Sequence, residues 1–412
     1  MEKTLFHEIQ QFTIQHLERL VPRVRDVKSA EDCFRLQEEL LGLIYQVEEI
    51  ELEASRKLRG GYDLSIRAEQ WAAGRGARQL RTIGDAMAWM VTGGDRRAIA
   101  ALSQNDGPAR IYGKGEKGLR AEFQTVNAFW QQGHFALLHD LTNCLRIDDL
   151  TVCNRLHRQG VPDDHPCPPD EFSLVEIKSN HRARPSQNQK ARHEAAAAAI
   201  NEGADIHTTD GIRKQFRWSG GYENHEEALG RVLDNAMADG VAGEQIEEGW
   251  VVTAVRFVDW KPGTAAKDII GTWERKRAEL LDKANMRATP VHRLQTGDSA
   301  GRILKCIPFS LYPMEPRAVA FLTGDWLMFD STLSIEYFES RLNAAGMKTE
   351  RLSSDGAVLS ASVGNHAIQL HRASVEHALA ELVKIDVLAR ALRDWAAEPG
   401  FVGDGELILA VR

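Results

Sequence analysis

Long apolar runs are absent from this 412-residue chain, and cysteine is scarce. No stretch of about 18 apolar residues occurs, so we expect no transmembrane helix and no membrane partner. The opening residues MEKTLFHEIQQF are acidic and polar where a signal peptide needs an apolar core. The five cysteines are an odd number and widely scattered, which is not the pattern of a disulfide framework. We therefore expect a protein of the reducing cytoplasm.

An excess of basic residues is also lacking. The chain has 51 Lys+Arg against 59 Asp+Glu, a net charge of −8, which argues against a protein whose whole surface coats nucleic acid. A local basic face remains compatible with that total. Hydrophobic residues make up 43% and charged residues 27%, as in ordinary globular proteins. The length allows two or three domains.

The first predicted domain, residues 1–103, has the apolar spacing of helices. Ser29 and Asp32 have the spacing of a capping box, so a helix begins there, and Gly60-Gly61 ends it. We expect this helical region to serve in packing and to mediate homo-oligomer formation.

The second predicted domain, residues 104–240, changes to an α/β pattern. A compact helix–strand–strand–strand–helix unit is predicted, with a helix at 119–132, strands at 135–138, 144–152 and 172–178, and a helix around Ala195–Ala199. The third predicted domain, residues 241–412, is a further α/β domain. Its expected elements are strands at 250–258, 303–311, 325–330 and 406–411 and helices at 264–286 and 373–397.

Acidic residues and one lysine stand out in the second domain. Glu176 and Lys178 are two residues apart, so on a strand both side chains point to the same face. Asp148 and Asp149 lie in a strand-like run although Asp is disfavoured in strands, which indicates a function for one of them. Glu122 lies on the preceding helix.

These residue types suit metal-assisted hydrolysis of phosphodiesters. Mg²⁺ prefers hard oxygen ligands and takes one or two carboxylates from the protein, here Asp149, Glu176 or Asp148. The ion polarises the phosphate and activates water, while Lys178 positions that water and Glu122 assists. Mn²⁺ is an alternative ion for the same ligands.

Asp149, then Glu176-Ile-Lys178 on the next predicted strand, then a helix, resembles the PD-(D/E)XK or restriction-endonuclease-like nuclease superfamily. The resemblance covers about residues 119–202. It implies a mixed sheet core flanked by helices, here between an N-terminal helical region and a C-terminal α/β domain. It also implies DNA cleavage, in many members for restriction or anti-phage defence. This chain departs from the pattern in having no proline before Asp149 and a long gap between the motif strands, and Asp148 fits the motif as well as Asp149 does.

An acid-x-Lys triplet is weak by itself, because about two are expected by chance in a chain of this composition. Four occur: Asp26-Val-Lys28, Glu176-Ile-Lys178, Asp259-Trp-Lys261 and Glu274-Arg-Lys276. The second is favoured because an acid-bearing segment lies just upstream of it.

Charge near the favoured triplet supports a nucleic-acid site. The segment 178–193 contains no acid, which is a local cationic stretch in an acidic chain. We expect it to bind DNA, with RNA not excluded, through Arg182, Arg184, Gln187, Gln189, Lys190 and Arg192.

Two other interpretations stay open. Cys153, His157, His165 and Cys167 could hold Zn²⁺ in the loop between the motif strands, although their spacing matches no familiar zinc finger. The same core could also serve as a non-catalytic nucleic-acid-binding or regulatory scaffold.

Overall fold

The computed structural model describes the chain in ranges separated by gaps: 5–103, 111, 115–154, 172–177, 187–202, 204, 206–208, 211–218, 223–258, 265–296, 307–352, 357–397 and 406–411. The chain forms two compact units, Met1–Ala204 with Pro308–Leu311 and Asp205–Ile307 with Tyr312–Arg412. An N-terminal helical region precedes sheets that are mostly antiparallel and packed with helices, so the predicted mixed α/β class is confirmed at this level. The division into three domains stays a prediction.

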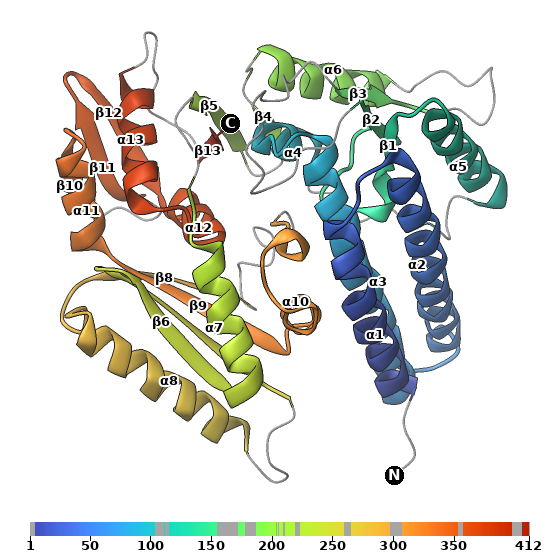
Figure 1. The fold of residues 1–412 in the computed structure, drawn as a ribbon, viewed down its shortest axis with the longest axis horizontal. Helices are drawn as coiled ribbons and strands as arrows, with labels where there is room; N and C mark the ends of the chain where they lie inside the picture. The colour runs from blue at the N-terminus through green and yellow to red at the C-terminus, as the bar shows by residue number, and fades with distance from the viewer. Residues whose placement is uncertain are drawn as a thin grey trace. The chain divides into compact units, whose positions relative to one another are not determined.

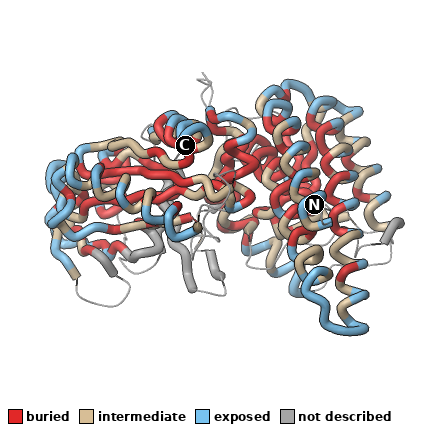
Figure 2. The backbone as a smooth tube through the Cα atoms, turned by 90° about the horizontal axis from the view of Figure 1, so that it is seen from below, coloured by how far each residue is buried: buried red, intermediate tan, exposed pale blue. Residues whose placement is uncertain are grey.

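Four helices open unit 1, as the apolar spacing predicts. They are α1 (Leu5–Arg25), α2 (Ala30–Leu58), α3 (Leu64–Val91) and α4 (Arg96–Leu102). The capping box at the start of α2 is present: Ser29 Oγ accepts the Asp32 N–H, and Asp32 Oδ2 accepts the Ser29 N–H. The long helix α3 packs against both α1 and α2 (Figure 1). Its last four turns are almost wholly buried, and Figure 2 shows the buried residues on the inner sides of these helices.

Unit 1 continues with α5 (Gly115–Gln131), β1 (Phe135–Leu138), a 3-10 turn η2 (His139–Leu141), β2 (Leu150–Cys153), β3 (Phe172–Val175) and α6 (Gln187–Glu202). The three strands form one antiparallel sheet in the order β1-β2-β3 (Figure 1). The predicted order of helix, three strands and helix is therefore confirmed. The strand bounds are corrected: the chain is extended only from Leu150 onward, and β3 ends at Val175.

The correction at β2 has a physical reason. Asp148 adopts φ 61°, a left-handed conformation that cannot continue a strand and that Asp tolerates better than most residues. Asp148 and Asp149 therefore lie in a bend before the strand, not within it. Glu176 and Ile177 likewise follow β3, so the alternation of side chains along a strand does not govern Glu176.

A side chain of α2 completes the outer edge of β1. Gln37 is fully buried, its Nε2 donates to the Ala136 carbonyl at 2.7 Å, and its Oε1 accepts the Leu138 N–H at 2.9 Å. A carboxamide can satisfy the unpaired donor and acceptor of an edge strand in the way a neighbouring strand would. This contact fixes the sheet against the helical region.

The described residues of unit 2 form three further sheets. Its strands are β4 (Ile206–Thr208), β5 (Gly211–Trp218), β6 (Val241–Glu247), β7 (Trp250–Arg256), β8 (Val291–Gln295), β9 (Leu327–Ser334), β10 (Lys348–Arg351), β11 (Ala357–Val363), β12 (His366–His371) and β13 (Glu406–Val411). The sheet orders are β6-β7-β9-β8, β10-β11-β12 and β13-β5-β4, and β13 pairs with β5 in parallel. The helices are α7 (Glu226–Asp239), α8 (Ala266–Lys283), α10 (Pro316–Thr323), α11 (Ile335–Ala344), α12 (Arg372–Glu381) and α13 (Ile385–Ala396).

Two predictions for this region need correction. The helix expected over 373–397 is two helices, α12 and α13, because Leu382 between them has φ 55°, a left-handed conformation that ends a helix. The strand expected at 303–311 ends as a short 3-10 turn, η4 (Phe309–Leu311), which belongs to unit 1 and contacts α1 and α3. Residues 303–306 lie outside the described residues.

None of the described helices combines the length and the apolar character needed to cross a bilayer.

Candidate functional site

Two predicted acids lie at the same end of neighbouring strands. Leu150 at the start of β2 pairs with Val175 at the end of β3, so Asp149 just before β2 and Glu176 just after β3 meet at one edge of the sheet. The Asp149 N–H donates to the Val175 carbonyl at 3.1 Å, and the Ile177 N–H donates to Asp149 Oδ2 at 2.7 Å. The antiparallel register therefore brings together two acids that the sequence separates.

A cavity of about 200 Å³ lies at this edge. Asp148, Asp149 and Glu176 line it, together with residues from the segment before β2 and from α6: His139, Asp140, Leu145, Arg146, Ile147, Gln189 and Arg192. Three predicted acids and two predicted nucleic-acid-binding residues thus share one cavity. Carboxylates and guanidinium groups lie within the same small volume, which is the composition expected where a cation and a phosphate bind together.

Asp148 is paired with a histidine of α6. Its side chain is 5% exposed, and its Oδ2 lies 2.6 Å from Nδ1 of His193 on α6. Burial raises the pKa of Asp148, the His193 contact opposes the rise, and the nearby carboxylates of Glu176 and Asp149 add to it. The three carboxylates are therefore close enough to influence one another. A left-handed Asp beside this cavity is the kind of backbone strain that gathers at functional sites.

His139 holds the bend that carries both aspartates. Its backbone N–H donates to the Asp149 carbonyl at 2.9 Å, and its Nδ1 lies 3.1 Å from the Asp148 carbonyl. A carbonyl oxygen can only accept a hydrogen bond, so Nδ1 carries the proton. Nε2 then accepts a hydrogen bond from the Thr151 hydroxyl at 2.7 Å. Burial lowers the pKa of His139 to about 4, so the ring is neutral at pH 7. A neutral imidazole in this tautomer fits the bend without adding charge to it.

Buried polar side chains of α3 support the next part of the chain. Both oxygens of Asp85 accept hydrogen bonds: Oδ1 from the backbone N–H groups of Asn143 (2.6 Å) and Cys144 (3.0 Å), and Oδ2 from Asn143 Nδ2. Arg81 donates through Nε to the Asp140 carbonyl at 2.9 Å and pairs with Glu48 at 2.6 Å. The helical region therefore positions residues 140–144, which lead directly into the cavity wall.

The other predicted residues have different positions. Glu122 is buried on α5 and does not line the cavity. Gln187 and Lys190 are exposed on α6 outside the cavity, and Lys190 pairs with Glu194 at 3.5 Å. Cys153, a predicted zinc ligand, is buried at the end of β2. Lys178, Arg182, Arg184, His157, His165 and Cys167 lie outside the described residues.

Sequence reasoning missed Arg146 and the role of His193. Arg146 immediately precedes the Ile-Asp-Asp sequence and lines the cavity, and its Nη2 donates to the Thr142 carbonyl at 2.8 Å. His193 belongs to the acid-free stretch, and only the fold pairs it with Asp148. Proximity to the acids in sequence would have found the first residue, whereas no local signal identifies the second.

The carboxylates of the cavity suit some metal ions better than others. Within the described ranges, no group of three or more His, Cys, Asp or Glu side chains comes together as a metal site. A closed four-ligand cage of the structural zinc type is therefore not formed by the described residues. Mg²⁺ needs less, because it takes one or two carboxylates and completes its shell with water and substrate phosphate. Asp149 and Glu176, two carboxylates that line one cavity at the same strand end, fit that requirement.

Comparison of the chain with protein-family models, with curated proteins and with solved structures finds no match.

Proposed function

We propose that the chain is a metal-dependent nuclease that hydrolyses phosphodiester bonds of DNA at the cavity between β2, β3 and α6. The observation that carries the proposal is the pairing of Leu150 with Val175, which puts Asp149 and Glu176 at one strand end inside a shared cavity. The succession of α5, three antiparallel strands and α6 supports the resemblance to the restriction-endonuclease-like core. A role in restriction or anti-phage defence is an extension of that resemblance.

Asp149 and Glu176 are the residues that would hold Mg²⁺ or Mn²⁺. When bound, such an ion polarises the phosphate and lowers the pKa of a water molecule. Arg192 and Gln189 approach from α6 and offer a cation and a carboxamide to the phosphate backbone. His193 holds Asp148 in place, and His139 fixes the bend that presents both aspartates. Lys178 follows Ile177 in the sequence and is the proposed partner of the attacking water.

A non-catalytic nucleic-acid-binding protein is the second candidate. It is favoured by one observation: Arg192 and Gln189 of α6, groups suited to a phosphate backbone, line the same cavity as the acids. Under this proposal Arg192, Gln189 and the basic stretch bind a nucleic acid, and the acids only balance charge around them. The two candidates differ in whether a divalent ion is needed.

Cleavage of supercoiled plasmid with Mg²⁺ or Mn²⁺ separates the two candidates. Nuclease function requires that E176Q and K178A lose cleavage by at least about a hundredfold, because each removes a group that acts on the reacting phosphate. E194Q is the matched control, since Glu194 is an exposed acid of α6 outside the cavity. Calorimetry with Mn²⁺ should show heat in the wild type and in E194Q but not in E176Q. Equal activity in all variants, or DNA binding without any metal-dependent cleavage, would reject the nuclease proposal.

A further inference from the structure

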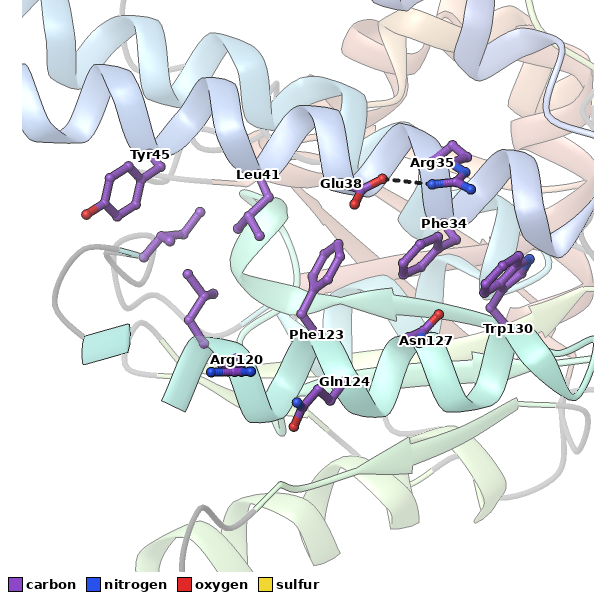
Figure 3. Close-up of a pocket in the computed structure, with 12 residues that line it drawn as sticks. Phe34, Arg35, Glu38, Leu41, Tyr45, Arg120, Phe123, Gln124, Asn127 and Trp130 are labelled. Carbon is purple, nitrogen blue, oxygen red and sulfur yellow. Dashed lines mark hydrogen bonds and ion pairs between the residues drawn. The ribbon is translucent and has the colours of Figure 1, made fainter. Parts of the chain in front are cut away.

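A second and larger cavity lies between α2 and α5, away from the acids. Its volume is about 900 Å³, within the range of small-molecule sites. The residues that line it come from α2 and α5 and from Ile111: Phe34, Arg35, Glu38, Leu41, Tyr45, Leu119, Arg120, Phe123, Gln124, Asn127 and Trp130. Figure 3 shows the aromatic side chains between the two helices. The proposed nuclease chemistry uses none of these residues.

Three rings form a continuous aromatic wall. Phe34 stacks on Trp130 with centroids 4.9 Å apart and planes 8° from parallel, and Phe123 lies 5.3 Å from Phe34. The Arg35 guanidinium carbon lies 6.0 Å from the centroids of both Phe34 and Trp130. Such a wall offers a surface on which a flat aromatic molecule can stack. Aromatic side chains stack on any planar aromatic ring, because every such ring has a π face.

A polar row runs along α5 beside this wall, two of whose rings, Phe123 and Trp130, belong to the same helix. Arg120, Gln124 and Asn127 are four and three residues apart, so they lie on one face of the helix. Within the described part of the chain, these three side chains form no hydrogen bond or ion pair. Asn127 is half-buried inside a helix, although Asn is a poor helix former, and Figure 3 shows it directed toward the gap near Phe34 and Trp130. Hydrogen-bonding groups that no described residue pairs, beside a stacking wall, favour a ligand that supplies partners.

We propose that this cavity binds a purine nucleoside monophosphate, a role that goes beyond the nuclease function and does not depend on it. The base packs against the aromatic wall, and the Asn127 carboxamide, both donor and acceptor, pairs with its edge. Arg120 lies about 10 Å along the helix axis from Asn127, a span that suits the phosphate of the same molecule.

Charge limits the ligand to a single phosphate group. Arg35 is paired with Glu38 at 3.2 Å, which leaves Arg120 as the cation for the ligand among the described lining residues. The Glu38 carboxylate also lines the cavity and repels further phosphates. A continuous single strand of nucleic acid, which needs several cations along its backbone, is therefore disfavoured.

Isothermal titration of the full chain with AMP tests the proposal. The titration contains EDTA, so the result is independent of any metal-dependent cleavage. AMP should bind more tightly than UMP, because a purine offers more stacking area, and more tightly than adenosine, because Arg120 meets the phosphate. N127A should weaken AMP binding about tenfold. The R120A variant should bind AMP no more tightly than it binds adenosine, because it lacks the cation that meets the phosphate. Q131A, an exposed residue of the same helix outside the cavity, should bind AMP as the wild type does.

Several results would overturn the nucleotide site. They are absence of AMP binding at millimolar concentration in the wild type, equal affinity in N127A and the wild type, or tighter binding of a short single-stranded oligonucleotide that N127A weakens. Arg120, Gln124 and Gln131 are exposed and Asn127 is half-buried, so these variants should keep the fold. Circular dichroism of each variant checks that loss of binding is not loss of structure.

Discussion

His193 on α6 contacts Asp148, in the bend before β2, across 45 positions of sequence, with 2.6 Å between Nδ1 and Oδ2. The Asp148 side chain is 5% exposed, whereas that of His193 is 43% exposed. The contact therefore links a surface helix to a buried carboxyl group at the cavity. In the nuclease proposal, the bend before β2 binds the metal and α6 binds the phosphate, so this contact joins the two binding segments.

The His193–Asp148 contact should stabilise unit 1 modestly. We expect H193A to lower the free energy of unfolding by about 1 kcal/mol, since solvent weakens a half-exposed pair. Urea denaturation measures the change. K190A is the control on the same helix, because Lys190 and Glu194 are both exposed and their pair should contribute less than about 0.5 kcal/mol. An equal loss in the two variants would show that the His193 contact has no special role.

Replacing His139 with a side chain that cannot take up a proton should change how stability depends on pH. Burial lowers the pKa of His139 from 6.5 to about 4, so the folded state binds its proton less readily than the unfolded state does. The contribution of His139 to the free energy of unfolding is fully present above about pH 6.5. It is lost as the pH falls toward 4, by about 3 kcal/mol in total. We expect H139Q, which cannot take up a proton, to lack this loss in urea denaturation between pH 7 and 4. If H139Q and the wild type lose stability in parallel, the ring is not held neutral by burial.

Asp85 should have the opposite pH dependence. Burial raises the pKa of Asp85 from 3.8 to about 6, so the folded state binds its proton more readily than the unfolded state does. The contribution of Asp85 to the free energy of unfolding is therefore full below pH 3.8 and is lost as the pH rises through 6, again by about 3 kcal/mol. The contributions of Asp85 and His139 partly cancel in the wild type over this range, so each is visible only in a single variant. We expect D85N, relative to the wild type, to become more stable as pH rises from 4 to 7. If the stability of D85N changed with pH in parallel with that of the wild type, the raised pKa of Asp85 would be contradicted.

Much of the local structure near the cavity could be predicted from the sequence. The capping box at Ser29 and the order of α5, β1, β2, β3 and α6 follow from local patterns. These features depend on residues close together in the chain. Strand ends were less predictable, because the left-handed Asp148 delays the start of β2.

What the sequence could not predict depends on contacts between distant residues. The pairing of Leu150 with Val175 requires the register of two strands separated by a long segment, and no local pattern sets that register. Gln37 completes the edge of β1 from a helix 99 positions away from Ala136, and an isolated Gln in a helix gives no sign of that role. The buried Asp85 and Arg81 likewise look like ordinary polar residues of a helix until their partners at 140–144 are known.

Gly84 on α3 should tolerate no side chain. A Cβ at this position would lie 1.9 Å from the Leu141 carbonyl oxygen, a backbone atom that cannot rotate away. We expect G84A to destabilise unit 1 by about 3 kcal/mol and to disturb the His139–Leu141 turn beside the cavity. G42A is the matched control on α2, since a Cβ there meets nothing within 4 Å, and Ala should stabilise that helix by about 0.5–1 kcal/mol. Opposite signs in thermal denaturation are the expected result, and a neutral G84A would mean that α3 and the turn can separate without loss.

Gln37 offers the sharpest test of how the sheet is held. Q37M keeps the length of the side chain but leaves the Ala136 carbonyl and the Leu138 N–H without their buried partner. Each unsatisfied group costs about 1–3 kcal/mol, so we expect a loss of about 2–4 kcal/mol in total. Q46M, at an exposed position of the same helix, should change stability by less than about 0.5 kcal/mol. Hydrogen exchange should also show faster exchange at Leu138 in Q37M alone, because its amide would lose its acceptor. If the Leu138 amide stays protected in Q37M, β1 is held by its pairing with β2, and the carboxamide bridge from α2 is not needed.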